Sequence, residues 1–141
     1  MSGDFRIRVE SDVVFVVESG RLDFDASNHA IVLAVEAAKA ASTKCLLFDV
    51  RDADLSNYYS YIVRHADMAA DTGIDAGFSI AVVGRPDATD VLSFIELVAR
   101  NRGWRAKCFY DPDKALAWLR GAGAGAAATR GSDAGSPASP R

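Results

Sequence analysis

Three aspartates near the middle of the chain form its densest group of side chains that could do chemistry. Asp49, Asp52 and Asp54 lie within six positions and follow a buried apolar run at 45–48. In a parallel sheet, ligands collect at the carboxyl ends of the strands, which is where these carboxylates would lie. Three carboxylates at this spacing can hold Mg²⁺. They can equally form a polar loop whose acids cap the next helix, and both interpretations stay open.

Three arginines beside a tryptophan form a second group. Arg100, Arg102 and Arg105 flank Trp104. Guanidinium groups beside an aromatic ring can bind a phosphate or an acidic partner. Cations in the last turn of a helix also interact favourably with its dipole, without any ligand. We therefore treat these arginines as a candidate anion-binding site, with a solvated helix end as the alternative.

The cysteines and histidines do not form a recognisable catalytic or metal-binding set. Cys45 and Cys108 are isolated in apolar runs, which is typical of small buried residues. His29 and His65 lie in helical patterns without a Cys or His at ligand spacing. No glycine-rich phosphate loop follows any predicted strand. We expect no catalytic residue, no cofactor and no metal, and we favour a protein that is not an enzyme.

Apolar patterns predict the elements that position these groups. Apolar and β-branched runs predict strands over 5–9, 13–17, 45–48, 78–83 and 106–109. Apolar residues at i, i+3 and i+4 predict helices over 31–41, 55–66, 91–99 and 115–119. Because strands alternate with helices after the first two strands, we predict an α/β fold. Its five-stranded sheet is mostly parallel, with an N-terminal antiparallel hairpin strand and four helices.

Several polar residues and glycines are placed to begin or end these helices. Ser56 and Asp87 lie near the starts of helical patterns, and their side chains can accept hydrogen bonds from free backbone N–H groups as N-caps. Gly73, Gly103 and Gly121 follow helical patterns, where a left-handed residue commonly ends a helix.

The composition changes sharply after residue 120. Residues 121–141 are almost all Gly, Ala, Ser, Thr and Pro, which predicts a flexible tail because such a segment buries little apolar surface. We therefore predict one domain over 4–120. The helix that closes this domain is too short to be stable alone in water, so we expect Trp118 and Leu119 to be buried in the core.

Charge and hydropathy exclude several classes of function. Half of the 141 residues are apolar and a quarter are charged, as in an ordinary globular domain. The net charge of -3 lacks the basic excess of a nucleic-acid-binding protein. No apolar run approaches the roughly 18 residues of a membrane span, and the N-terminal residues lack the basic-then-apolar order of a signal peptide. We expect a cytoplasmic protein without a nucleic-acid partner.

Five stretches resemble the STAS-like domains, the family of sulfate-transporter and anti-sigma-factor-antagonist domains. Residues 46–56 are similar to the family's central strand, loop and helix. The SpoIIAA-like (STAS/SEC14-type) bacterial branch is matched by 64–67, 98–104, 108–111 and 115–119. The resemblance covers about residues 4–120. It implies a SpoIIAA-like fold and a regulatory, non-enzymatic role.

The resemblance also implies a candidate switch. In the anti-sigma-factor antagonists, a serine at the start of the helix after the central strand is phosphorylated, which blocks kinase binding. Ser56 is nearest that place, although the glycine of the family's signature is missing here. The candidate interaction surface consists of Asp49, Asp54, Ser56, Tyr58 and Tyr59. We expect a protein partner, and a homodimer is one form that this interaction could take.

Two functions remain after this reasoning. The first is a non-enzymatic protein-interaction or regulatory module of the STAS-like type. The second is a domain that binds a small anionic or lipid-like ligand, or a small enzyme, using the acidic residues after the central strand and the three arginines. The first function predicts no deep pocket. An enclosed apolar cavity beneath Tyr58 and Tyr59 would favour the second.

Overall fold

The computed structural model describes residues 3–10, 12–56 and 58–128. Its strands are β1 (Asp4–Glu10), β2 (Val13–Arg21), β3 (Cys45–Asp54), β4 (Ser79–Val83) and β5 (Arg105–Phe109). Its main helices are α1 (Phe24–Ala40), α2 (Tyr59–Asp67), α4 (Thr89–Asn101) and α5 (Pro112–Ala128), with single turns at α3 (Ala69–Thr72) and η1 (Pro86–Ala88). None of the helices found in these ranges has the length and apolar composition of a membrane span.

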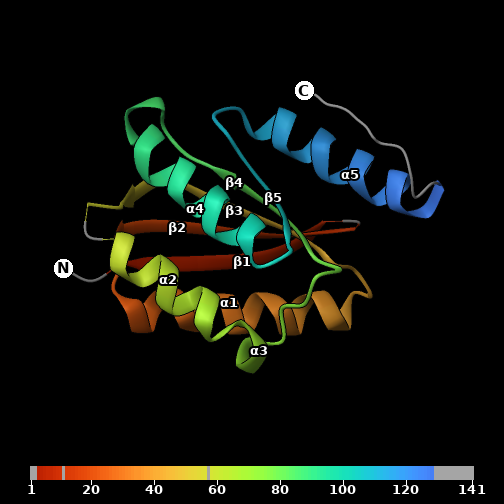
Figure 1. Ribbon diagram of the computed structural model, residues 1–141, viewed down its shortest axis with the longest axis horizontal. Coiled ribbons are helices and arrows are strands. Elements are labelled where there is room, and N and C mark those ends of the chain that lie inside the picture. The colour runs from red at the N-terminus through yellow and green to blue at the C-terminus, as the bar shows by residue number, and fades with distance from the viewer. Residues whose placement is uncertain (1–2, 11, 57, 129–141) are drawn as a thin grey trace.

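The five strands form a sheet in the order β1-β2-β3-β4-β5 (Figure 1). β1 pairs antiparallel with β2, and every later pair is parallel. Parallel neighbours need a crossover connection, and helices α1 to α4 supply these crossovers between β2 and β5. This arrangement confirms the predicted α/β fold with its N-terminal antiparallel strand.

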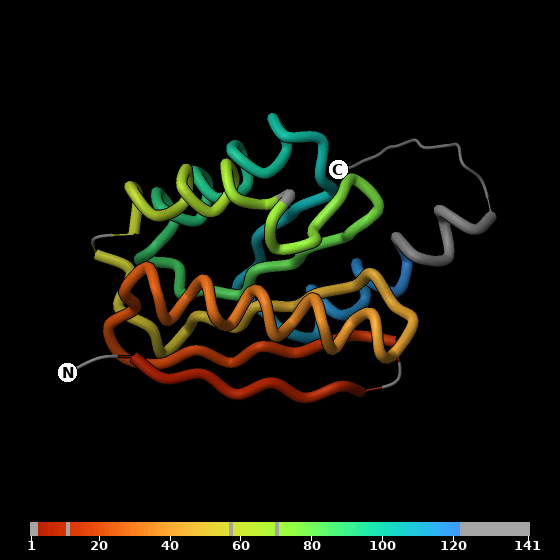
Figure 2. Tube along the Cα trace, turned by 90° about the horizontal axis from the view of Figure 1, so that it is seen from below, coloured from red at the N-terminus to blue at the C-terminus, as the bar shows by residue number. Residues whose placement is uncertain are grey.

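Helices cover the two faces of the sheet unequally (Figures 1 and 2). α1, α2 and α4 pack on one face, where their apolar side chains and those of all five strands form the larger core. On the other face, α5 is the one helix of the described ranges that contributes to the smaller core, through Ala115 and Leu119. These two side chains meet Val13, Leu47 and Ala81 of the sheet.

The closing helix α5 buries Leu119 more completely than Trp118. Leu119 is 0% exposed, whereas Trp118 is partly buried against the smaller core. The ring centroids of Trp118 and Phe109 are 5.8 Å apart. The prediction that both residues are core is confirmed for Leu119 and only in part for Trp118.

Alternation along β2 decides which side chains enter the larger core. Val14 and Val16 are fully buried there, and Glu18 continues the same row because every second side chain of a strand shares a face. The pairing of β2 with β3 shifts register between Val17 and Ser19. Irregularities of this kind redirect side chains locally. Glu18 is only 4% exposed, so a carboxyl group enters an apolar core.

The central strand is longer than the sequence predicted. β3 continues to Asp54 instead of ending at residue 48, because its polar second half still pairs with the last residues of β2. Asp and Arg are uncommon in strands, so the apolar pattern missed this part. Asp49, Asp52 and Asp54 therefore lie on a strand, and the prediction that they form a loop after it was wrong.

Helix α2 begins later than predicted, at Tyr59 rather than at residue 55. The Asp54 side chain accepts a hydrogen bond from the backbone N–H of Ser56 at 3.0 Å, which makes a turn before the helix. Tyr58 occupies the N-cap position, and no side chain of the described residues caps the helix. Ser56 is therefore not the N-cap that the sequence predicted.

Other helix ends agree with the sequence in part. Gly73 and Gly103 have φ of 95° and 90°, so their predicted left-handed positions are confirmed. Asp87 lies in η1, and within the described ranges no side chain caps α4, so the predicted Asp87 cap was wrong. Gly121 lies inside α5, which its alanine-rich sequence continues to Ala128. The rest of the predicted tail, 129–141, lies outside the described residues.

The Asp23 side chain caps a helix in the structure, although the sequence did not suggest it. We expect this cap to stabilise the folded protein. The Asp23 carboxylate accepts a hydrogen bond from the Ala26 N–H at 2.8 Å and caps α1. We expect Asp23→Ala to lower the free energy of unfolding by about 1 kcal/mol. Ser56→Ala should change it by less than about 0.5 kcal/mol, because Ser56 is exposed and caps nothing. Urea denaturation measures both, and equal losses would contradict these helix starts.

Candidate functional site

A cavity of about 120 Å³ that is partly open to solvent lies in the larger core, between the sheet and helices α1, α2 and α4. Its walls are mainly apolar. Phe48, Val50, Ile80, Val82 and Ala106 line it from the sheet, and Ile31, Ile62, Ala66, Ile95, Val98 and Ala99 line it from the helices. Alanine at positions 66, 99 and 106 leaves space that larger side chains would fill. The helices therefore cover the sheet without closing the space between them completely.

Besides Thr72, the cavity wall contains four polar side chains that we term the polar cluster: Glu18, Ser27, Tyr58 and His65. His65 Nε2 lies 2.7 Å from Ser27 Oγ. The ring centroids of Tyr58 and His65 are 5.9 Å apart, and the His65 ring stacks on Phe24 at 4.6 Å. β2, α1 and both ends of α2 thus bring these groups together.

Burial changes the protonation of the polar cluster. It raises the pKa of Glu18 from its ordinary 4.5 to about 7, and no hydrogen bond or opposite charge of the described residues counteracts it. Burial, helped by the charge of Arg64, lowers the pKa of His65 from 6.5 to about 4. Burial and the nearby Glu18 raise the pKa of Tyr58. At neutral pH the histidine and tyrosine are therefore uncharged, and Glu18 is near its midpoint.

Sequence reasoning missed Glu18 and assigned His65 to no catalytic or metal-binding set. The sequence pattern contained a signal for both residues. Glu18 continues the inward row of Val14 and Val16, and a carboxyl in such a row is seldom buried without a reason. His65 lies three residues after the buried Ile62, so the two share a helix face. Among the candidate interaction residues, Tyr58 is the one that lines the cavity.

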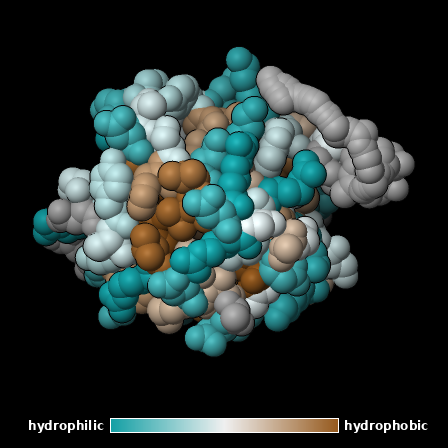
Figure 3. Space-filling model, in the orientation of Figure 1, coloured by the Kyte–Doolittle hydropathy of each residue, from teal (hydrophilic) through white to brown (hydrophobic). Residues whose placement is uncertain are grey.

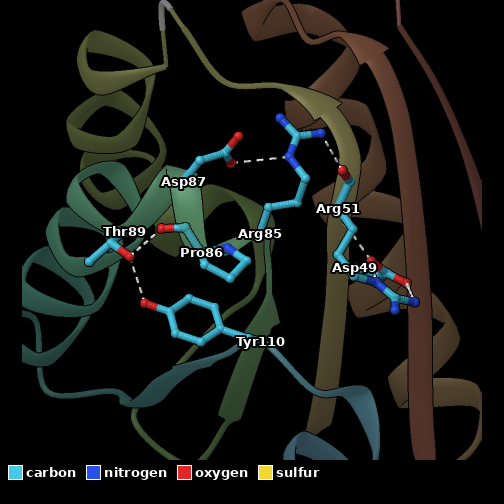
Figure 4. A network of polar contacts seen from close by, with 7 residues as sticks. All are labelled: Asp49, Arg51, Arg85, Pro86, Asp87, Thr89 and Tyr110. Atoms are coloured by element: carbon cyan, nitrogen blue, oxygen red, sulfur yellow. Dashed lines mark hydrogen bonds and ion pairs between the residues drawn. The ribbon is translucent and has the colours of Figure 1, made fainter.

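Asp49 and its neighbours lie at the carboxyl edge of the sheet, where their charges are already paired (Figure 4). Burial alone would raise the pKa of Asp49, but hydrogen bonds from Arg51, the shortest at 2.7 Å, outweigh it and lower the pKa. Arg85 donates to the Arg51 carbonyl at 2.7 Å and pairs with Asp87 at 3.1 Å. Within the described ranges, no group of three or more His, Cys, Asp and Glu residues is placed to hold a metal ion.

A polar groove of about 360 Å³ lies between the end of β3 and the start of α4. It brings together three candidate interaction residues, Asp54, Ser56 and Tyr59, with Arg85. The Tyr59 side chain is 45% exposed and its ring packs on Phe94, with centroids 5.4 Å apart. This groove is the part of the predicted interaction surface that the structure gathers in one place.

The guanidinium groups of the three candidate anion-binding arginines contact different elements. Arg100 donates to the backbone of β5 at 3.0 Å. Arg102 pairs with Asp67 of α2 at 2.6 Å. Arg105 lies 5.9 Å from the ring centroid of Trp118 in α5. An anion would therefore meet side chains that already have other partners.

The two cysteines lie in strands, as the sequence predicted. Burial raises the pKa of both thiols, and that of Cys108 reaches about 12. The Cys108 thiol also donates to the Leu92 carbonyl at 3.1 Å. Because the thiolate is the reactive form, both side chains are poor nucleophiles at neutral pH.

Two solved structures share this architecture. An anti-sigma factor antagonist from Mycobacterium paratuberculosis matches with a TM-score of 0.56 and 19% identity, over 84% of this chain and 94% of the other. A protein of the DUF3478 family with a SpoIIAA-like fold, from Shewanella loihica PV-4, matches with a TM-score of 0.55 and 17% identity, over 84% and 93%. These likenesses confirm the SpoIIAA-like fold. No family model matches the sequence, and no curated protein is significantly similar to it.

Proposed function

We propose that this SpoIIAA-like domain is a non-catalytic module that binds a small, mainly apolar molecule inside its larger core. The cavity of about 120 Å³ carries this proposal. Protein cores seldom contain voids larger than a water molecule, and an apolar cavity of about 150 Å³ stays dry and binds benzene. We therefore place the ligand site at the cavity beside Tyr58 and not at the acidic residues that the sequence suggested.

The chemistry of the wall supports binding without a reaction. No cysteine of the described residues lines the cavity. The Ser27 hydroxyl lies 3.2 Å from the Phe24 carbonyl and 2.7 Å from His65 Nε2. His65 Nδ1 has no partner among the described residues, so the third group that orients a catalytic Ser–His pair is missing there. Tyr58 is protonated at neutral pH because its pKa is raised. We therefore assign the wall a binding role.

Filling the cavity should abolish binding while the protein stays folded. Ala99 lines the cavity from α4 and is 6% exposed, so Ala99→Leu places extra carbon atoms where a ligand would lie. We expect benzene to shift the amide NMR signals of residues around the cavity in the wild type and not in Ala99→Leu. Thermal unfolding should show that the variant is at least as stable as the wild type, as is common for cavity-filling substitutions.

The matched control is Ala117→Leu, which makes the same change on the exposed face of α5. It should bind benzene like the wild type. If Ala99→Leu distorts the core, the smaller change Ala106→Val fills the cavity from β5 instead. Benzene binding that survives in both filled variants would contradict the proposed site.

A second candidate function is binding of a protein partner, or of a second copy of the chain, on the face formed by α2 and α4. Tyr59, Val63 and Leu97 are 45%, 39% and 55% exposed, and Figure 3 shows hydrophobic side chains gathered on this face. The fold shared with an anti-sigma factor antagonist supports this role. Ser56, in the adjacent groove, is the candidate switch. Affinity capture of a partner protein from native-host cell extract, with the wild type and Leu97→Ser as baits, tests this second function. Capture of the same partner in equal amount by Leu97→Ser would contradict it.

Both functions can operate in one regulatory module. α2 and α4 line the cavity with one face and expose Val63 and Leu97 on the other. A bound molecule would contact the inner faces of the same two helices that a partner would contact from outside. We therefore propose that ligand and partner act on the same pair of helices.

A further inference from the structure

The polar cluster restricts which molecules suit the cavity. Resting on the proposed function, we infer that the ligand is an uncharged molecule of about the size of a benzene ring with one hydrogen-bond-donating group, an amine or a hydroxyl, directed at Glu18. Three features of the wall lead to this inference: an unpartnered carboxyl, an unpartnered histidine nitrogen, and the sign of the local charge.

Glu18 is the side chain in the wall that most needs a partner. It is 4% exposed, it lines the cavity, and it lies among the apolar side chains of β2. No hydrogen bond or cation from the described residues stabilises its ionised form. A buried polar group without a partner is costly, and a donor that reaches it removes that cost. A ligand with a donor group would therefore gain more here than a purely apolar one.

His65 presents a second unpartnered polar atom in the polar cluster. Its Nε2 lies 2.7 Å from the Ser27 hydroxyl, and the tautomer of His65 decides which of the two donates. A neutral imidazole has a single N–H, so Nδ1 accepts a hydrogen bond when Nε2 carries the proton. His65 Nδ1 is buried and has no hydrogen-bond partner within the described residues. Above pH 7 the Glu18 carboxyl is mainly ionised and accepts hydrogen bonds, so it selects a ligand that donates.

Charge argues against the anionic ligand that the sequence left open. An anion would lie beside the Glu18 carboxylate, and like charges in an apolar interior repel strongly. The nearest basic side chain on α2, Arg64, places its guanidinium 3.7 Å from the ring centroid of Phe24 and is exposed. The cavity is therefore suited to neutral donors.

Four probes of similar ring size separate these possibilities: benzene, phenol, aniline and benzoate. Each is titrated into the full chain at pH 8 and followed by amide NMR shifts. Phenol and aniline should bind about tenfold more tightly than benzene, as expected for one hydrogen bond to a charged acceptor. Benzoate should bind most weakly. In Glu18→Leu, phenol and aniline should lose this advantage while benzene still binds.

The control Glu36→Leu changes an exposed glutamate of α1 and should leave all four affinities unchanged. If Glu18→Leu does not fold, Glu18→Gln serves instead and should reduce the advantage of phenol and aniline, because it removes the charged acceptor. Benzene binding without any advantage for phenol or aniline, or tighter binding of benzoate, overturns the inference and leaves the proposed function standing. Failure of all four probes to bind overturns both.

Discussion

Leu119→Ala should lower the free energy of unfolding by about 2–5 kcal/mol, the range for a leucine removed from a packed core. Leu119 is 0% exposed and joins α5 to Val13, Leu47 and Ala81. α5 is the one helix of the described ranges in this smaller core, so no other helix is placed to fill the space. Equilibrium unfolding in urea measures the loss as a lower midpoint.

Leu116→Ala is the matched control for this prediction. Leu116 lies on the same helix and is only partly buried against the smaller core, so the same substitution should cost clearly less. A loss below about 1 kcal/mol in Leu119→Ala, or equal losses in both variants, would mean that α5 does not dock through Leu119.

Glu18→Gln should make the protein more stable than the wild type at pH 8, by up to about 3 kcal/mol. The pKa of Glu18 is about 7 in the folded protein and 4.5 in the unfolded chain. Because the folded pKa is raised, the wild type is most stable below pH 4.5 and loses stability as the pH rises through 7. Glutamine carries no charge, so the variant should not show this loss. Urea unfolding at pH 5 and pH 8 measures it.

His65 titrates in the opposite direction and does not obscure this comparison. Its folded pKa of about 4 is lowered from 6.5, so its contribution is lost as the pH falls through that range. Both proteins carry His65, so its effect largely cancels in the difference between them. The exposed control Glu36→Gln should change little at either pH. A Glu18→Gln variant that is no more stable than the wild type at pH 8 would show that Glu18 is not buried without a partner.

The sequence predicted the elements whose patterns are local. The apolar run at 13–17, the helical stripes and the left-handed glycines Gly73 and Gly103 each depend on residues close together in the chain. The polar half of β3 was missed because its pairing with β2 is a tertiary interaction that overrides low strand propensity. The cap of α2 was misplaced because the Asp54 turn competes with helix formation.

The candidate site was harder to predict because it is a space that small side chains leave in the packed core. Ala66, Ala99 and Ala106 lie on three different elements, and only their packing across the sheet shows that they leave a space. Of the candidate interaction residues that the sequence selected, Tyr58 lies at the cavity, and Asp54, Ser56 and Tyr59 lie in the groove. Glu18 could have been found from the two-residue period of β2. The lowered pKa of His65 could not, because it depends mainly on burial in the packed core.

Xenon binding tests the central claim most directly, because xenon enters dry apolar cavities and makes no hydrogen bonds. A crystal of the protein held under xenon pressure should show xenon between Ile62, Ile80 and Ala99, which line the cavity from α2, β4 and α4. The same experiment on Ala99→Leu should show none there. An unoccupied core in the wild type, or equal xenon occupancy in both proteins, would contradict a ligand-binding cavity at this place.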